Sequence, residues 1–354
     1  MARRILLINW RDTRNPEAGG AETYYHEIYR RLAADGWRVD LLAHAFEGAP
    51  AEELVDGIRV IRRGSRALFN YEAVPFVREH QHEYDLIVED LNKLPFFTPL
   101  YVSRPRLHMV MHFFGPAIFH ETIFPFAAYV YSMERLISLT YRGERFVAIS
   151  KSTHDEVAER VKRHAGIDIV EPGIDTAFFQ PSVPKSKTPL LVCVSRLRKY
   201  KNVQFLIEAM PQLRSEIPDL TLTIAGGGEY RKPLESLASR LGVDDAVVFA
   251  GRVSEEEKRD LLSRATLFVN SSAKEGWGIT TIEAAMCGTA SVASDVAGLR
   301  DSVRDNDTGL LFPYNDRDAY VKATLTLLRD VSRRREMEKR ARIHAEALGW
   351  DRIA

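Results

Sequence analysis

Short apolar runs alternate with segments of helical periodicity along almost the entire chain. This alternation is typical of sheets with parallel strands and connecting helices. It begins at Arg4–Asn9, lapses between Ile174 and Pro189, where prolines punctuate a polar stretch, and restarts at Leu190–Val194. We therefore expect an α/β protein with two Rossmann-like parallel-sheet domains facing a cleft, over residues 1–178 and 179–354.

The expected elements fill both halves of the chain. In the first half the strands are Arg4–Asn9, Val39–Ala43, Ile58–Arg62, Asp85–Glu89, Leu107–His112, Arg145–Ile149 and Ile167–Val170. The helices there are Ala21–Ala34, Glu72–His82, Phe124–Leu139 and Lys151–Arg163. In the second half the strands are Leu190–Val194, Thr221–Ala225, Val247–Ala250, Leu267–Asn270, Ser291–Ser294 and Leu310–Phe312. Since ligands of such sheets bind at the carboxyl ends of strands, the loops there should carry the chemistry.

Composition excludes several classes of protein. Lys and Arg number 49 and so do Asp and Glu, so the chain lacks the basic excess of a nucleic-acid-binding domain. Cys193 and Cys287 form no C-x-x-C pair, which argues against a zinc site or a disulfide scaffold and favours the reducing cytoplasm. The apolar run Ile5–Ile8 stops at Asn9, so it predicts a first strand rather than a signal peptide. The sequence contains no apolar run of about 18 residues that would predict a membrane span.

The strongest local signal is a glycine-containing loop between a strand and a helix. Gly276 and Gly278 precede a helix that should start near Ile279, and unpaired backbone N–H groups at such a start form a phosphate site. Glu275 and Glu283 flank it, and two acids there suit hydroxyl groups, such as those of a ribose and a sugar. A plain strand–loop–helix turn explains the same spacing equally well.

A second loop carries two cations. Arg196 and Lys201 follow the strand Leu190–Val194, and together they would neutralise a diphosphate, with Arg196 offering a bidentate fork. From the residues alone, a solvated basic loop is the more common explanation. Two weaker signals are the glycines Gly226–Gly228 after a strand and Gly19-Gly20 at a helix start.

These motifs resemble the retaining glycosyltransferases of the GT-B fold, family 4, which include glycogen-synthase-like and mannosyltransferase-like enzymes. The family's E-x7-E run has the form EGFGLPVLEAMACGTP, and this chain reads EGWGITTIEAAMCGTA. It departs at Trp277, where Phe is usual, and at Thr280, where Pro is usual. The basic loop resembles the family's G-R-L-x-x-x-K-G element, with Ser195 and Asn202 in place of the glycines.

The resemblance implies a role for each matching residue. Arg196 and Lys201 would hold the donor diphosphate, Glu283 the ribose, the backbone near Val253 the base, and Gly19-Gly20 the phosphates from the first domain. His112, at the end of its expected strand, matches the family's active-site histidine. The residues implied for catalysis are Glu275, His112, Arg196 and Lys201. Those implied for donor binding are Gly19, Gly20, Arg196, Lys201, Gly227, Val253, Glu275, Gly276, Trp277, Gly278, Ile279 and Glu283.

The implied activity is transfer of a hexose from a UDP- or GDP-sugar to a glycan, glycolipid or small-molecule acceptor, with retention of configuration. The first domain would bind the acceptor and the second the donor. No metal or other cofactor is expected, because Asp305-Asn-Asp307 and Asp316-Arg-Asp318 spell D-x-D in turn or helix-start contexts, where Asp serves as a cap. The alternatives are a nucleotide-sugar epimerase on the same fold, an inactive binding module and a dinucleotide-dependent oxidoreductase; the last would need a G-x-G-x-x-G loop after the first strand.

Two stretches bear on a membrane surface. Aromatic side chains gather between His112 and Tyr141, and basic ones between Arg333 and Arg342. Each has an ordinary explanation, a buried core and a solvated face respectively, and each also suits peripheral contact with the inner membrane surface. Finally, family members normally continue after the segment that matches Trp350–Ala354 into a last helix that crosses back onto the first domain, and we expect that helix to be absent or short here.

Overall fold

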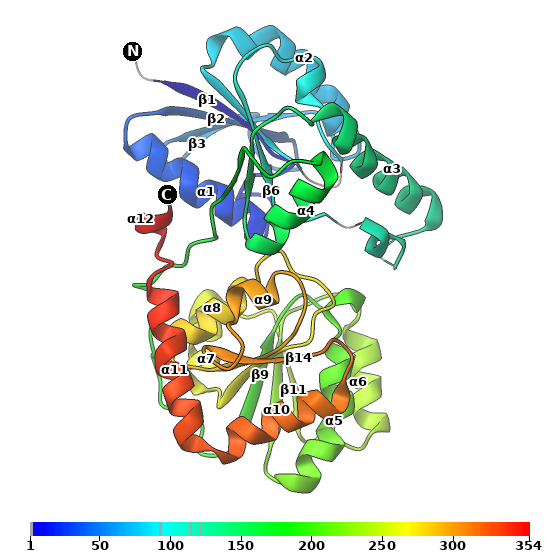
Figure 1. Cartoon of the computed structure of the whole chain (residues 1–354), viewed down its shortest axis with the longest axis vertical. Coiled ribbons are helices and arrows are strands. Elements are labelled where there is room, and N and C mark those ends of the chain that lie inside the picture. The colour runs from blue at the N-terminus through cyan, green and yellow to red at the C-terminus, as the bar shows by residue number, and fades with distance from the viewer. Residues whose placement is uncertain (1–2, 92–93, 114, 121) are drawn as a thin grey trace. The chain divides into compact units, whose positions relative to one another are not determined.

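The computed structural model describes residues 3–91, 94–113, 115–120 and 122–354. The chain forms two compact units, Met1–Gly173 with Trp350–Ala354, and Ile174–Gly349 (Figure 1). Each unit is a sheet flanked by helices. The division falls after Gly173 rather than after residue 178, because Ile174 donates its N–H to Leu348 O (2.8 Å) and so joins the second unit.

The first unit is built on one large sheet. Within the described residues it has eight strands in the order β3-β4-β2-β1-β5-β6-β7-β8, all parallel except for the β3–β4 pair. The strands are β1 (Arg4–Ile8), β2 (Arg38–His44), β3 (Glu52–Val55), β4 (Ile58–Arg63), β5 (Leu86–Asp90), β6 (Arg106–Val110), β7 (Phe146–Ala148) and β8 (Ile167–Ile169). The helices are α1 (Gly20–Ala34), α2 (Phe69–His80), α3 (Phe124–Thr140), α4 (Lys151–Val161) and α12 (Trp350–Ile353).

The second unit repeats the plan with six described strands, all parallel, in the order β11-β10-β9-β12-β13-β14. The strands are β9 (Leu190–Val194), β10 (Thr221–Ala225), β11 (Val247–Gly251), β12 (Leu267–Asn270), β13 (Ser291–Ser294) and β14 (Gly309–Phe312). The helices are α5 (Val203–Glu216), α6 (Arg231–Arg240), α7 (Glu255–Arg264), α8 (Ile279–Met286), α9 (Leu299–Ser302), α10 (Arg317–Arg329) and α11 (Val331–Glu346), with a short 3-10 turn, η4, at Lys199–Lys201.

The sequence explains these elements in the way expected for covered parallel sheets. Central strands are buried on both faces, so β9 reads as an unbroken apolar run, and β12 reads as three apolar residues followed by Asn270, rather than as alternating patterns. The apolar face of α5, including Leu206 and Met210, packs in one core with Leu191 and Leu222 of the sheet. The expectation of two parallel-sheet α/β domains is confirmed.

Two sequence expectations in the first unit were wrong in detail. β3 was not predicted, although Asp56-Gly57 between β3 and β4 is a strong hairpin signal: both residues have positive φ (48° and 84°), as a two-residue type I′ turn requires. The strand containing His108 was predicted to end at His112, whereas β6 ends at Val110 and His112 lies in the loop beyond it.

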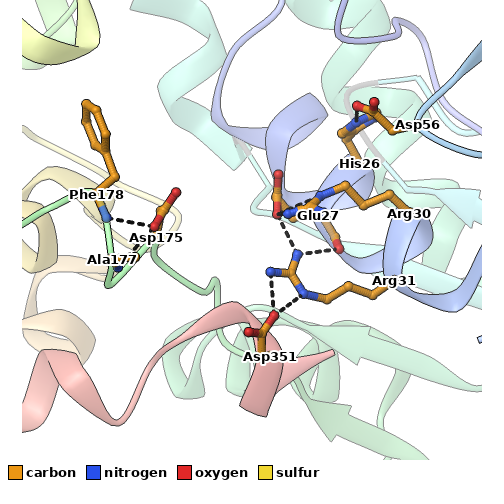
Figure 2. Close-up of polar contacts among 9 residues, drawn as sticks. All are labelled: His26, Glu27, Arg30, Arg31, Asp56, Asp175, Ala177, Phe178 and Asp351. Atoms are coloured by element: carbon orange, nitrogen blue, oxygen red, sulfur yellow. Dashed lines mark hydrogen bonds and ion pairs between the residues drawn. The ribbon is translucent and has the colours of Figure 1, made fainter. Parts of the chain in front are cut away.

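The chain returns to the first unit at its end. Trp350 packs against Tyr24 of α1, with ring centroids 6.1 Å apart, and its ring lies over Gly173, where an added Cβ would meet it at 2.4 Å. Arg31 of α1 donates to Asp351 of α12 through Nε (2.8 Å). It also donates through a terminal guanidinium nitrogen to the carboxylate of Glu27, as Figure 2 shows. Trp350–Ile353 therefore form the single helical turn α12, which packs on the first unit.

Candidate functional site

Loops at the carboxyl ends of β9, β10, β12 and β13 meet at one edge of the second sheet. The loop after β12 is tied to the loop after β9, since Ala273 N donates to Tyr200 O (2.8 Å) and Ser271 Oγ to Asn202 O (2.9 Å). The β13 end joins through Ser294 Oγ, which donates to Ser272 O (2.6 Å). The two sequence motifs, one basic and one acidic, thus share one site within this unit.

Glycines let these loops approach closely. At Gly226 (φ 131°) an added Cβ would lie 1.9 Å from Ser195 O, and at Gly228 (φ 157°) one would lie 2.3 Å from Leu197 O. Gly227 O accepts from Leu197 N (2.9 Å), so the β10 loop lies directly on the basic β9 loop. Any side chain at Gly226 or Gly228 would separate the two backbones.

Lys201 and Glu275 form the centre of the site. Lys201 Nζ donates to Glu275 Oε1 at 2.5 Å, and their side chains are only 12% and 14% exposed. Burial alone would raise the pKa of Glu275, but the charge and hydrogen bond of Lys201, with help from Ser272 and Asn270, lower it overall. Burial likewise opposes the charge on Lys201, and Glu275 outweighs it, so the pKa of Lys201 is raised. Both groups are therefore ionised at neutral pH.

Arg196 stands at the exposed side of this pair. Its side chain is exposed, and its charge lies close enough to Lys201 to act on the pKa of that amine. The site thus carries two cations, an exposed guanidinium and a buried ammonium that is paired with Glu275. That combination suits a diphosphate, which needs charge from more than one direction.

The helix start predicted near Ile279 is where α8 begins. Gly278, its N-cap, has φ 79°, and an added Cβ there would meet Leu299 Cδ2 at 2.7 Å. Gly298 (φ 83°) lies against the loop from the other side, where a Cβ would be 2.3 Å from Glu275 O. Trp277 is 3% exposed, and its Nε1 is buried without a hydrogen-bond partner among the described residues.

Glu283 lies within α8, 6% exposed, with Lys258 of α7 donating to its Oε1 (2.9 Å). Burial raises the pKa of Glu283 overall, although Lys258 acts to lower it. The sequence did not predict Lys258 as a site residue, because its contact with Glu283 joins two different helices and no spacing within either helix indicates it. Val253, expected near the base, is half-buried just beyond β11.

The expected site residues of the first unit lie in its own loops. Gly19 is the N-cap of α1, and its N–H donates to Glu22 Oε2 (2.7 Å), while Gly20 has open space where a Cβ would stand. His112 is half-buried in the loop after β6. The expected roles of Gly19, Gly20 and His112 in binding the donor remain predictions.

His108 is a core residue of the first unit. Its Nδ1 lies 3.3 Å from Glu89 Oε2 and its Nε2 lies 3.2 Å from Glu144 Oε2, with its own side chain fully buried. Burial acts to lower the pKa of His108, but the hydrogen bond to Glu144 and the negative charges of Glu89 and Glu144 raise it overall. The imidazole thus sits between two carboxylates, which favour its charged form.

Three of the four D-x-D acids have structural partners. Asp316 Oδ1 accepts from Ala319 N (2.9 Å) as the N-cap of α10, Asp305 Oδ1 accepts from Leu311 N (2.8 Å), and Asp307 pairs with Arg340 Nε (2.8 Å). In the described ranges no cluster of three His, Cys, Asp or Glu residues suits a metal ion. Asp316 is therefore a helix cap and Asp305 a turn residue, as their sequence context predicts.

The aromatic stretch divides between core and surface. Phe113 and Tyr141 are fully buried, whereas Phe124 and Phe126 are 73% and 62% exposed; Phe114 lies outside the described residues. The basic stretch is a solvated face with local partners, such as Arg333 to Asn306 Oδ1 (2.8 Å). No helix in the described part of the chain has the length and apolar character to cross a bilayer.

Two family models match the chain. The model of the glycosyl transferases group 1 matches residues 175–344, and that of glycosyltransferase family 4 matches residues 18–178. Together they account for both units.

Similar proteins and similar solved structures agree with these two family matches. The GDP-mannose-dependent alpha-(1-6)-phosphatidylinositol monomannoside mannosyltransferase of Mycolicibacterium smegmatis is 34% identical over 52% of this chain, but over only 53% of its own length. The D-inositol 3-phosphate glycosyltransferase of Streptomyces bingchenggensis is 28% identical over 96% of this chain and 83% of its own. The sucrose-phosphate synthase of Thermosynechococcus elongatus shares the fold, with a TM-score of 0.83 at 24% identity over 99% of this chain and 96% of that one. The chain is therefore a glycosyltransferase of the GT-B fold and of the family 4 type.

Proposed function

We propose that this enzyme transfers a hexose from a UDP- or GDP-sugar to a glycan, glycolipid or small-molecule acceptor, with retention of configuration. The observation that carries the proposal is the buried Lys201–Glu275 pair (2.5 Å) beside the exposed Arg196 at the carboxyl edge of the second sheet. The two cations match a diphosphate, and the ionised carboxylate matches the hydroxyls of the attached sugar. The second unit is then the donor domain and the first the acceptor domain.

The proposed step is a displacement on one face of the sugar. The acceptor oxygen bonds to the anomeric carbon as the bond to the diphosphate breaks, and the departing diphosphate oxygen takes the acceptor's proton. Arg196 and Lys201 stabilise the growing negative charge on the diphosphate. Glu275 is held by Lys201 and Ser272, which suits a group that positions a sugar hydroxyl rather than a nucleophile. His112 would hydrogen-bond another sugar hydroxyl from the first unit.

We propose also that transfer needs no divalent metal or other cofactor. Arg196 and Lys201 supply the positive charge that a metal supplies in other sugar transferases, and three of the four D-x-D acids already have partners. Unchanged turnover in the presence of a chelator is the expected result. Activity abolished by the chelator and restored by magnesium or manganese would contradict this part of the proposal.

The acceptor is proposed from the relatives' names, which specify a phosphatidylinositol mannoside and an inositol phosphate. A panel of UDP- and GDP-hexoses should reveal the donor by thermal shift, because a ligand at about 100 times its Kd stabilises the folded state by about 2.7 kcal/mol. Inositol phosphates and lipid-linked glycans then serve as acceptors. A folded enzyme that no nucleotide sugar stabilises would refute the donor proposal.

A peripheral contact with an anionic membrane surface is the last part of the proposal, for a cytoplasmic enzyme whose two cysteines are free thiols. Tyr71 of α2 and Tyr129 of α3 hydrogen-bond through their hydroxyls (2.6 Å), so the two helices share one surface. The exposed large apolar residues of α2, α3 and their N-caps are Leu68, Tyr71, Ile123, Phe124, Phe126, Leu136 and Leu139. The acid of α3, Glu134, is buried, whereas Arg135 and Arg142 are exposed.

Vesicle sedimentation tests this contact. The wild type should bind phosphatidylglycerol vesicles more than phosphatidylcholine vesicles, since basic groups flank the apolar side chains. Phe124→Ser with Phe126→Ser should abolish the binding, while Val331→Ser, at an apolar residue 42% exposed in the second unit, should leave it intact. Equal binding by both variants would contradict the contact.

A further inference from the structure

Lys258 connects α7 to the acid of α8. The two helices pack against each other in the second unit (Figure 1), and α7 begins at a capping box in which Ser254 and Glu257 satisfy each other's backbone N–H groups. One residue later, Lys258 Nζ reaches across to Glu283 Oε1 at 2.9 Å. The side chains of Lys258 and Glu283 are only 13% and 8% exposed, so the pair is shielded from water.

Lys258 is itself held in place. Its Nζ lies 2.7 Å from Glu255 Oε2, one turn earlier on α7, and 5.0 Å from the centroid of the Phe179 ring. An acid and an aromatic face thus fix the ammonium from two further directions. The position of Glu283 Oε1 is accordingly set by a built arrangement and not by a loose surface contact.

The two carboxylate oxygens of Glu283 differ. Oε1 has Lys258, whereas Oε2 is buried and has no hydrogen-bond partner among the described residues. A buried acceptor atom without a hydrogen-bond partner destabilises the folded state, because it loses its hydration and gains no bond in return. Natural structures therefore rarely contain such an atom unless a ligand or a water molecule binds to it. Glu283 Oε2 is therefore an acceptor available for a ligand donor.

We propose that Lys258 is a positioning residue of the donor site, which holds Glu283 ionised by its Oε1 and thereby presents Oε2 to the hydroxyl pair of the donor's ribose. This inference rests on the proposed function. An ionised carboxylate only accepts hydrogen bonds, and a hydroxyl donates to it; a protonated carboxyl would bring a competing donor. Burial raises the pKa of Glu283 and Lys258 opposes the rise, which agrees with this role.

Nucleotide analogues test the role of Lys258. Titration calorimetry would compare UDP and GDP with their 2′-deoxy and 3′-deoxy analogues. The wild type should prefer the ribonucleotide by about tenfold or more, the effect of a hydrogen bond to a charged group. Lys258→Met should remove that preference by weakening the ribonucleotide alone, and Lys258→Arg should retain most of it. Lys339→Met, at an exposed lysine of α11, is the matched control and should keep the full preference.

A double-mutant cycle keeps the test decisive if Lys258→Met folds poorly, since that change leaves a buried carboxylate without its cation. Glu283→Gln removes the charge, and Lys258→Met added to it should cause no further loss of ribose preference. A wild-type preference that survives in Lys258→Met, or a further loss in the double variant, overturns the inference alone. A wild type that binds neither nucleotide overturns the proposed function and this inference together.

Discussion

At the scale of single residues, the two cations assigned to the diphosphate differ in what else they do. Lys201 is buried against Glu275, whereas Arg196 is exposed. The removal of Lys201 leaves a buried carboxylate unpaired, which is strongly destabilising, while the removal of an exposed arginine is not. Substitution of Arg196 should therefore affect nucleotide binding alone, whereas substitution of Lys201 should affect both nucleotide binding and the stability of the fold.

Arg196→Ala and Lys201→Ala should each weaken nucleoside-diphosphate binding by about 1.5–3 kcal/mol. Only Lys201→Ala should also lower the unfolding temperature by several degrees, because it orphans Glu275. Calorimetric titration and thermal unfolding of both variants check this. Wild-type nucleotide affinity in both would refute the assignment of the basic loop.

His108 gives the first unit a pH dependence. The pKa of Glu144 is lowered to about 2, chiefly by its hydrogen bond to His108, so its stabilisation is present above the ordinary 4.5 and lost as the pH falls toward 2. The pKa of His108 is raised, so its stabilisation is present below the ordinary 6.5 and lost as the pH rises through the folded value. The stabilising contributions of Glu144 and His108 are therefore both fully present between pH 4.5 and pH 6.5, the ordinary pKa values of the two groups.

Thermal unfolding across a pH series should show this window. The difference in unfolding temperature between the wild type and His108→Gln should be largest between about pH 4.5 and 6.5, and should shrink on both sides. His82→Gln, at an exposed histidine, provides the control and should track the wild type. A difference that stays constant from pH 4 to 9 would show that His108 is not a buried cation.

At the scale of elements, the site depends on loops that only glycine allows to touch. Gly298→Ala would put a Cβ 2.3 Å from Glu275 O at a φ of 83° and so displace the acidic loop. We expect a loss of nucleotide binding of tenfold or more, roughly the value of one charged hydrogen bond, with reduced stability. Gly143→Ala, where a Cβ meets nothing within 4 Å, should change neither property. Calorimetric titration of both variants decides, and normal nucleotide affinity in Gly298→Ala would contradict this account of the loop.

The sequence predicted the elements far better than the contacts between them. Buried parallel strands read as apolar runs, so most strands could be predicted, and so could the helix start at Ile279. The strand β3 was not predicted, because Glu52–Val55 is short and half of its residues are charged. The partner of Glu283 could not be predicted, because Lys258 meets it across two helices. The composition of the aromatic stretch likewise could not separate buried Phe113 from exposed Phe124.

At the scale of the whole molecule, the chain leaves the first unit at Gly173 and returns to it at Trp350. Trp350 is 8% exposed and lies on Gly173 and Tyr24, whereas Asp351 is 94% exposed in its pair with Arg31. Buried aromatic area, rather than the surface ion pair, should therefore hold α12 in place.

Trp350→Ala should destabilise the first unit by about 3 kcal/mol, while Asp351→Ala should cost no more than about 1 kcal/mol. Differential scanning calorimetry measures both. Equal effects of the two substitutions would show that the ion pair, and not the indole, anchors the chain end.

The central claim is retaining transfer of a hexose from a nucleotide sugar, and the anomeric configuration of the product tests it most directly. With an α-linked UDP- or GDP-hexose and an inositol phosphate or lipid-linked acceptor, proton NMR of the anomeric coupling should show an α-glycoside and released nucleoside diphosphate. Glu275→Gln should give the same α product more slowly, without a glycosylated protein in intact mass spectra. A β-glycoside, or a nucleotide sugar altered only at its own stereocentres with nothing transferred, would contradict the account.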